Sequence, residues 1–238
     1  LTKIVWHTRS VVGLMNRIIK NKLLPLILAP LLAISINAHA EVRRSKVISI
    51  YDNPKYGADF SHFAYVNPKA PQGGKITMPA YGGFDSFNPF IFKGIASPEV
   101  AALTLDSLGV IPTDDETSVY PLIAKEFEIP DDHSFIGFII DEKAKFSDGS
   151  KITADDVVFS FDSIIKKGAP FYKIYYADIK KIEKINDHHV RFYFNPNSTN
   201  KELPLILAQL KIFSAKDWEH KDFSTPSLQP PLGSGPYI

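Results

Sequence analysis

Two pairs of neighbouring polar residues are the first candidates for metal binding or catalysis in this 238-residue chain. His188 and His189 could ligate a metal, but adjacent residues of a strand point to opposite faces, so we expect a solvated hairpin turn. Asp155 and Asp156 could act as an acid–base pair, yet adjacent helical residues diverge, and acids at a helix start stabilise the positive end of its dipole. We assign neither pair to catalysis and predict no metal site.

Motifs for nucleophilic catalysis and nucleotide binding are weak or missing. Ser234 lies between two glycines, but its surroundings do not match the G-x-S-x-G nucleophile turn. The chain contains no cysteine, which excludes a thiol nucleophile, a thiolate zinc site and disulfides. It also has no phosphate-cradling G-x-x-x-x-G-K sequence and no dinucleotide fingerprint. We therefore expect no catalytic residue and no cofactor, with an exported hydrolase of peptides or cell-wall fragments as the alternative.

The best candidates for ligand binding lie in the glycine-rich and aromatic stretch from Tyr81 to Phe90. Apolar walls with a few well-placed polar groups are typical of small-ligand clefts. The same rings could instead pack the loop onto the body of the protein, because exposed and buried aromatic residues look alike in sequence. The candidate ligand-binding residues are Phe84, Asp85, Ser86, Phe87 and Asn88.

The first 40 residues have the layout of a secretory signal peptide. A basic cluster at Arg17–Lys22 precedes the apolar stretch Leu23–Ile36, and Ala38–Ala40 resembles a cleavage site. The apolar stretch is shorter than the roughly 20 residues of a membrane-spanning helix. We predict cleavage after residue 40 and export to the periplasm, with residues 1–14 as an upstream extension.

Composition and charge narrow the class of the remaining chain. With 45% hydrophobic and 22% charged residues, the sequence is that of a globular protein. Without residues 1–40, the basic residues fall from 27 to 22 while the 26 acidic residues remain, so the net charge is −4. The clustered basic surface of a nucleic-acid-binding protein is therefore missing, and we expect no nucleic-acid partner.

A first helix is predicted between Ser97 and Gly109. Ser97-Pro98-Glu99 provides a capping hydroxyl, a proline at the first helical position and an early acid. Ala101, Leu105 and Leu108 recur at helical spacing, which indicates a face that packs into the core.

A second helix is predicted after the Asp148-Gly149 turn. Thr153 is placed as its N-cap, and Asp156 three residues later completes a capping box. Val157, Phe161 and Ile164 would form its buried face, and Gly168 is placed to end it.

The strands predicted from composition and alternation are short. A hairpin is expected from Ile179–Ile185 and Val190–Phe194, joined by Asn186-Asp187. Leu203–Phe213 is expected to form a helix followed by a strand. The other expected strands are Val47–Ile50, Lys75–Met78, Ser134–Ile140 and a short one ending at Phe146. Strands and helices without strict alternation predict a mixed α+β or mixed-sheet α/β domain.

Several of these motifs, in the same order, resemble the family 5 extracellular solute-binding proteins, the peptide- and nickel-binding components of ABC importers. They are Phe146–Gly149, Thr153–Val157 and Gly233–Tyr237, preceded by Pro121–Ala124. The stretch Phe84–Phe90, together with the upstream pairs Tyr51-Asp52, Tyr56-Gly57, Asn67-Pro68 and Gly73-Gly74, is similar to the YejA-like branch.

The resemblance implies a fold like that of type II periplasmic binding proteins. Residues 41–238 would form the first, amino-terminal lobe of a two-lobed clamp, truncated so that the second lobe is missing. The implied function is binding of a peptide or peptide-like ligand, by a monomer, for delivery to the membrane permease of an ABC importer. The loop that matches Phe84–Phe90 lies on the cleft side of that lobe in the family. A lobe alone would bind weakly or not at all, since shallow contact recovers little of the cost of immobilising a ligand. An inert fragment, with apolar surface exposed where the missing part would pack, is therefore a further alternative.

Overall fold

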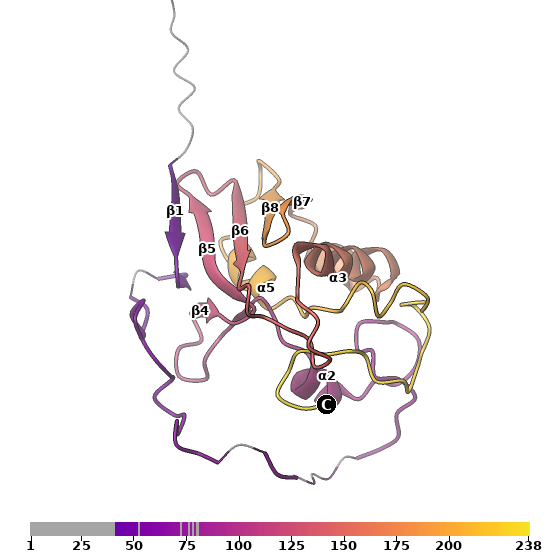
Figure 1. The fold of residues 1–238 in the computed structure, drawn as a ribbon. Coiled ribbons are helices and arrows are strands. Elements are labelled where there is room, and N and C mark those ends of the chain that lie inside the picture. Colours follow the sequence, from indigo (N-terminus) through magenta and orange to yellow (C-terminus); the bar gives the residue numbers. More distant parts are fainter. Residues whose placement is uncertain (1–40, 52, 72, 76, 78, 80) are drawn as a thin grey trace, which may run out of the picture. The chain divides into compact units, whose positions relative to one another are not determined.

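The structure is a computed structural model that describes residues 41–238 except 52, 72, 76, 78 and 80. The predicted signal peptide lies outside the described residues, as do two of the four residues of the predicted strand at 75–78. The described part combines antiparallel sheets with four short or medium helices, which confirms the predicted mixed α/β class (Figure 1).

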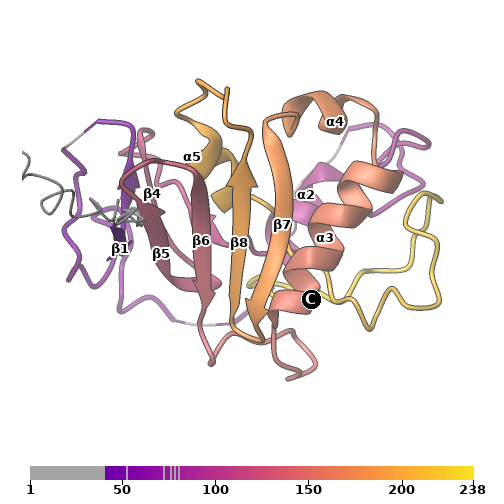
Figure 2. The same cartoon turned by 90° about the horizontal axis from the view of Figure 1, so that it is seen from above.

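The larger sheet has five strands in the order β1-β5-β6-β8-β7, all antiparallel to their neighbours (Figure 2). In that order, the strands are Val42–Ser45, Ala124–Pro130, Phe135–Ile140, His189–Phe194 and Ile179–Asn186. Every residue of β6, the central strand of this sheet, is buried.

A smaller sheet continues from the larger one through two bent strands. Its order is β2-β4-β3, with bounds Ile48–Ser49, Ser118–Pro121 and Gly109–Val110. Only two residues separate β1 from β2 and β4 from β5. The pairing of β1 with β5 therefore passes directly into the pairing of β2 with β4. One antiparallel ribbon thus joins the two sheets.

The core lies between the larger sheet and the helix α3, Ala154–Lys167. The buried ring of Phe138 makes edge-to-face contacts with Phe127 and Phe192 on the neighbouring strands, with centroids 5.7 and 5.8 Å apart. Phe161 of α3 reaches the same cluster, 5.2 Å from Phe192. Aromatic pairs of this geometry add to the stabilisation from burial alone. Three shorter helices complete the fold: α2 Pro98–Thr104, α4 Phe171–Tyr175 and α5 Leu203–Ala208.

The elements with strong local signals are confirmed. α3 begins after Thr153 with a complete capping box to Asp156 and ends at Gly168. The predicted hairpin corresponds to β7 and β8, and the predicted strand at Ser134–Ile140 corresponds to β6. At the turn before α3, Gly149 has a φ of 86°, and Asp148 accepts a hydrogen bond from the Ser150 N–H at 2.8 Å.

Three predicted elements are wrong in extent. The helix predicted up to Gly109 ends at Thr104, because the next residues are drawn into extended pairing: the Ile212 N–H donates to the Asp106 carbonyl. Ala101, Leu105 and Leu108 are nevertheless buried, as predicted. The strand predicted to end at Phe146 is only an isolated bridge from Lys145 to Lys151, and the strand predicted after α5 is only a bridge at Lys211. None of the described helices has the length and hydropathy that crossing a membrane requires.

Candidate ligand-binding site

The aromatic loop is held by a short parallel pairing with the segment that leads into α2. The N–H groups of Asp85 and Ser86 donate to the Ile95 carbonyl, at 3.0 and 3.2 Å, and the Ser97 N–H donates to the Ser86 carbonyl at 3.0 Å. The Asp85 carboxylate accepts a further bond from the Ile95 N–H at 2.7 Å. These bonds hold the aromatic loop and the segment before α2 side by side.

Like Asp85, two more of the five predicted site residues have structural roles in this loop. Ser86 and Asn88 are buried, and the Ser86 hydroxyl accepts a bond from the Asn88 N–H at 3.0 Å. The Asn88 amide donates to the Phe223 carbonyl and accepts from the Phe90 N–H, each at 3.0 Å. Because their polar groups are bonded internally, these side chains shape the loop.

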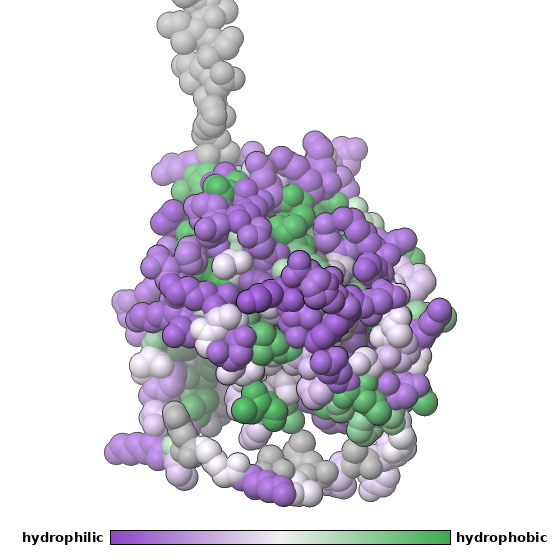
Figure 3. All heavy atoms as spheres, turned by 45° about the vertical axis from the view of Figure 1, so that its right-hand side comes forward, coloured by the Kyte–Doolittle hydropathy of each residue, from purple (hydrophilic) through white to green (hydrophobic). Residues whose placement is uncertain are grey.

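The surface of the site is apolar. Phe84 is 49% exposed and lies against the half-buried Phe87, with ring centroids 5.4 Å apart. Phe92 and Ile95, which sequence reasoning missed, are 79% and 63% exposed. Their signal was present as an apolar run on either side of Gly94. Figure 3 shows separate apolar patches on the lower part of a face whose upper part is largely hydrophilic.

Gly94 allows the two segments of the site to approach closely. Its φ is 85°, a left-handed conformation that favours glycine. A Cβ atom at this position would lie 2.5 Å from the Asp85 carboxylate and 3.0 Å from the Pro226 ring. A larger residue would therefore push Ile95 away from Asp85.

The segment at Ala96 presents an unused backbone edge. In a parallel bridge, the residue opposite the bonded one directs its own N–H and C=O to the other side. Ser86 makes both bonds of this bridge, so the polar backbone groups of Ala96 point away from the loop. No partner for them occurs among the residues that the structure describes. An extended chain could pair here.

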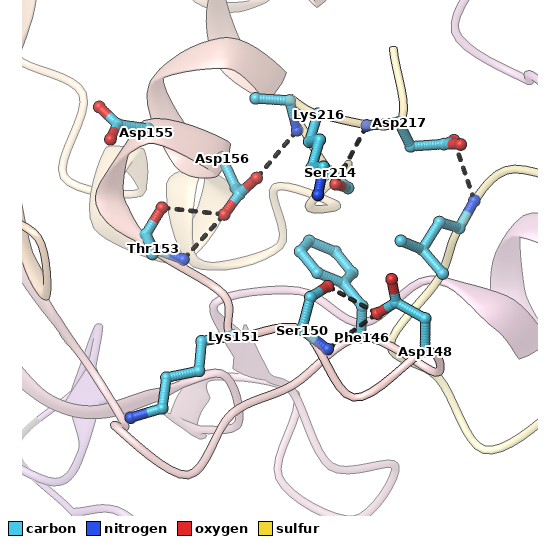
Figure 4. A pocket seen from close by; sticks show the side chains of 12 residues that line it. Phe146, Asp148, Ser150, Lys151, Thr153, Asp155, Asp156, Ser214, Lys216 and Asp217 are labelled. Atoms are coloured by element: carbon cyan, nitrogen blue, oxygen red, sulfur yellow. Dashed lines mark hydrogen bonds between the residues drawn. The ribbon is translucent and has the colours of Figure 1, made fainter. Parts of the chain in front are cut away.

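A pocket of about 530 Å³ lies elsewhere, at the start of α3 (Figure 4). Its acidic side chains are engaged within the protein. Asp156 accepts bonds from the Thr153 N–H and the Ala215 N–H, both at 2.8 Å. Asp217 accepts from the Leu232 N–H at 3.2 Å and pairs with Lys221. These acids tie chain segments together, which agrees with a helix-start role for the Asp155-Asp156 pair.

The other sequence candidates also have internal partners. His188 is exposed, but His189 is buried 2.8 Å from Glu128, so the predicted solvated turn is wrong for His189. Burial lowers the pKa of the His189 imidazole from its usual 6.5. The Ser234 hydroxyl accepts a bond from the Asp106 N–H at 3.3 Å. Within the described ranges, no three His, Asp or Glu side chains gather into a set of metal ligands.

Comparison of the sequence with known protein families gives a match over the second half of the chain. The sequence profile of the bacterial extracellular solute-binding proteins, family 5 Middle, matches residues 118–238. This chain belongs to that family. The match includes α3, its capping box and the glycine-rich segment at 233–235, whereas the stretch Phe84–Phe90 lies outside it.

Curated relatives and solved structures agree with the family. The chain is 40% identical over 198 residues to the peptidoglycan-binding protein YepA of Agrobacterium fabrum, covering 80% of this chain and 32% of the relative. It is 35% identical over 199 residues to the probable peptide-binding protein YejA of the same organism, covering 81% and 32%. The chain thus spans about a third of the length of these relatives, and it resembles the YejA-like branch.

The fold is also found in a solved family structure. The oligopeptide-binding protein AppA of Bacillus subtilis, solved with a nonapeptide, superposes with a TM-score of 0.53 at 21% identity. The alignment covers 65% of this chain and 31% of AppA. The likeness confirms a fold of the periplasmic binding protein type.

Proposed function

We propose that this chain is the first lobe of the peptide-binding component of an ABC importer, working in the periplasm, and that this lobe binds its ligand weakly along the Phe84–Ala96 site. The observation that carries the proposal is the unused backbone edge at Ala96 beside exposed apolar side chains. An extended peptide can add to such an edge through main-chain hydrogen bonds, which are independent of its sequence.

The surrounding side chains suit variable apolar residues of a peptide. Phe84, Phe92 and Ile95 offer exposed apolar surface. Aromatic side chains bury large areas against many partners at little entropic cost. The names of the relatives, a peptide-binding and a peptidoglycan-binding protein, support a peptide or peptide-like ligand. The residues assigned to ligand contact are Phe84 and Phe87, with Asp85, Ser86 and Asn88 as the frame of the loop.

The remaining partner in this proposal is a separate membrane permease. The sequence has no G-x-x-x-x-G-K motif and no dinucleotide fingerprint, and in this proposal other subunits supply the energy for transport. The protein would act as a monomer that presents its ligand to the permease.

Nuclear magnetic resonance titration of the full chain tests the proposal. Trileucine and an extended nonapeptide would be added up to millimolar concentrations, and the backbone amides of Gly94 and Ala96 would be followed. We expect saturable shifts at these amides, and Phe84→Ala or Phe92→Ala should weaken binding about tenfold. Tyr65→Ala, which removes an exposed ring outside the site, should leave binding unchanged. Absence of shifts with every peptide would refute the proposal.

A further inference from the structure

The chain after α5 forms a long irregular segment that wraps the candidate site. We call residues 214–237 the strap. It contains no helix or strand, and Figures 1 and 2 show it, in yellow, leaving the body beside α3 and curving around. Its end lies against α2, because the Gly235 N–H donates to the Thr104 carbonyl at 2.9 Å.

The strap is anchored on the family motif around α3. The Ala215 N–H donates to the Asp156 carboxylate at 2.8 Å. The Ser147 N–H, in the turn before α3, donates to the Gly233 carbonyl at 2.8 Å. Asp156 is buried and also caps α3, so one carboxylate fixes both the helix start and the beginning of the strap.

The middle of the strap touches the aromatic loop. The Phe87 N–H donates to the Ser227 carbonyl at 2.9 Å, and the Asn88 amide donates to the Phe223 carbonyl at 3.0 Å. Pro226 lies close to Gly94, on the other segment of the site. The strap therefore contacts both segments whose pairing creates the edge at Ala96.

The end of the strap closes on α2 without room for side chains. A Cβ atom on Gly233 would lie 1.9 Å from the Thr104 carbonyl oxygen, and one on Gly235 would lie 2.6 Å from that of Leu103. The Ser234 hydroxyl between them accepts the Asp106 N–H. These glycines permit a backbone approach that any other residue would prevent.

We infer that the strap is a positioning element for the ligand-binding edge, and that Gly233, Ser234 and Gly235 act through α2. α2 begins two residues after Ala96, and the Ser97 N–H binds Ser86. A displacement of the carboxyl end of α2 is thus transmitted to the pairing of Ser86 with Ala96. The role as a ligand-binding edge rests on the proposed function, whereas the mechanical coupling does not.

Hydrogen exchange of the full chain tests the coupling without any ligand. In Gly235→Ala, we expect the amides of Asp85, Ser86 and Ser97 to exchange at least about tenfold faster, while amides of β6 and β8 keep their rates. Val190→Ala, which removes buried volume from β8, is the matched control for general destabilisation. It should accelerate the sheet amides as much as those of the site. Unchanged exchange at the three site amides in Gly235→Ala would overturn the inference.

A milder pair of variants covers the case in which Gly235→Ala does not fold. Ser234→Ala removes only the acceptor of the Asp106 N–H, and Ser234→Thr keeps it. We expect faster exchange at Ser97 in the first variant and rescue in the second. Equal exchange in both variants would count against the inference.

Peptide titration of the same variants then separates the two proposals. Altered exchange together with weaker trileucine binding supports both. If exchange is altered in the variants but the wild type binds no peptide, the coupling is supported and the peptide-binding function is refuted. Peptide binding by the wild type with unaltered exchange in the variants refutes only the coupling.

Discussion

The Oε2 atom of Glu128 lies 2.9 Å from both Nε and Nη2 of Arg191, although the strand β6 runs between the two residues. The residue of β6 in register with both is Gly137, and a Cβ atom there would lie 2.8 Å from the Glu128 Cβ. Arg44 and Glu183 extend the row onto β1 and β7. The sheet face opposite the Phe138 core thus carries a row of alternating charges.

Glu128→Gln should destabilise the protein strongly, because the buried carboxylate holds Arg191 and faces Arg44 and His189. Loss of one partner of a buried ion pair leaves the other uncompensated, and we expect a cost of about 2 to 4 kcal/mol. Urea unfolding would measure the free energy. Glu126→Gln is the matched control on the same strand: its contact with Arg44 is 3.9 Å and partly exposed, so its loss should cost less than about 1 kcal/mol.

Gly137→Ala should also destabilise, for a steric reason. The added methyl group would meet the Cβ and Oε2 atoms of Glu128 at 2.8 and 2.9 Å. Overpacking of this kind costs about 1 to 3 kcal/mol. The same unfolding experiment on Gly57→Ala provides the comparison, because no atom lies within 4 Å of the Cβ position there. If Gly137→Ala and Gly57→Ala were equally stable, the predicted steric clash at position 137 would be wrong.

Acidification should destabilise the protein through His189. Burial lowers the folded-state pKa of this imidazole below the unfolded value of about 6.5. The unfolded chain therefore binds a proton that the folded protein does not, and stability is lost as the pH falls from 6.5 through the folded pKa. The facing groups are Glu128, Arg191 and Arg44, and the two arginines oppose protonation.

His189→Gln should accordingly lose less stability than the wild type between about pH 7.5 and about pH 5.5. Thermal melting at several pH values measures this difference. His188→Gln, a change at the neighbouring exposed histidine, should keep the wild-type slope. A wild-type slope in both variants would exclude His189 as the source.

Local signals made part of the fold predictable. The Thr153 cap, the Asp148-Gly149 turn and the alternation in the β7–β8 hairpin act within a few residues, and the structure confirms all three. The strands β1 and β5 were not predicted from the sequence. In β1, Arg43 and Arg44 carry no strand pattern of their own. Their partners in β5 lie more than 80 residues away along the chain.

The site was harder to predict than the fold. Ser86 and Asn88 were selected as polar groups for a ligand, but contacts with the distant Phe223 and within the loop engage them. The exposure of Phe92 depends on tertiary packing, which the local sequence does not reveal. The burial of His189 likewise depends on Glu128, 61 residues earlier in the chain. Sequence composition therefore singled out the loop that we propose as the ligand site, but it could not assign roles to the residues within it.

The adjacent acids Asp155 and Asp156 provide the most direct test of how the family motif works. Asp156 is buried and bonds to both Thr153 and Ala215, so Asp156→Ala removes half of the capping box and one anchor of the strap. We expect a loss of about 2 to 4 kcal/mol in unfolding free energy. Asp155 is exposed and pairs with Lys184 at 2.7 Å on the surface, so Asp155→Ala should cost less than about 1 kcal/mol. Urea unfolding of the two variants compares them directly, and fluorescence of Trp218, with Trp6 replaced by phenylalanine, reports on the strap. Equal losses in both variants, with the same Trp218 spectrum, would mean that Asp156 does not anchor the strap.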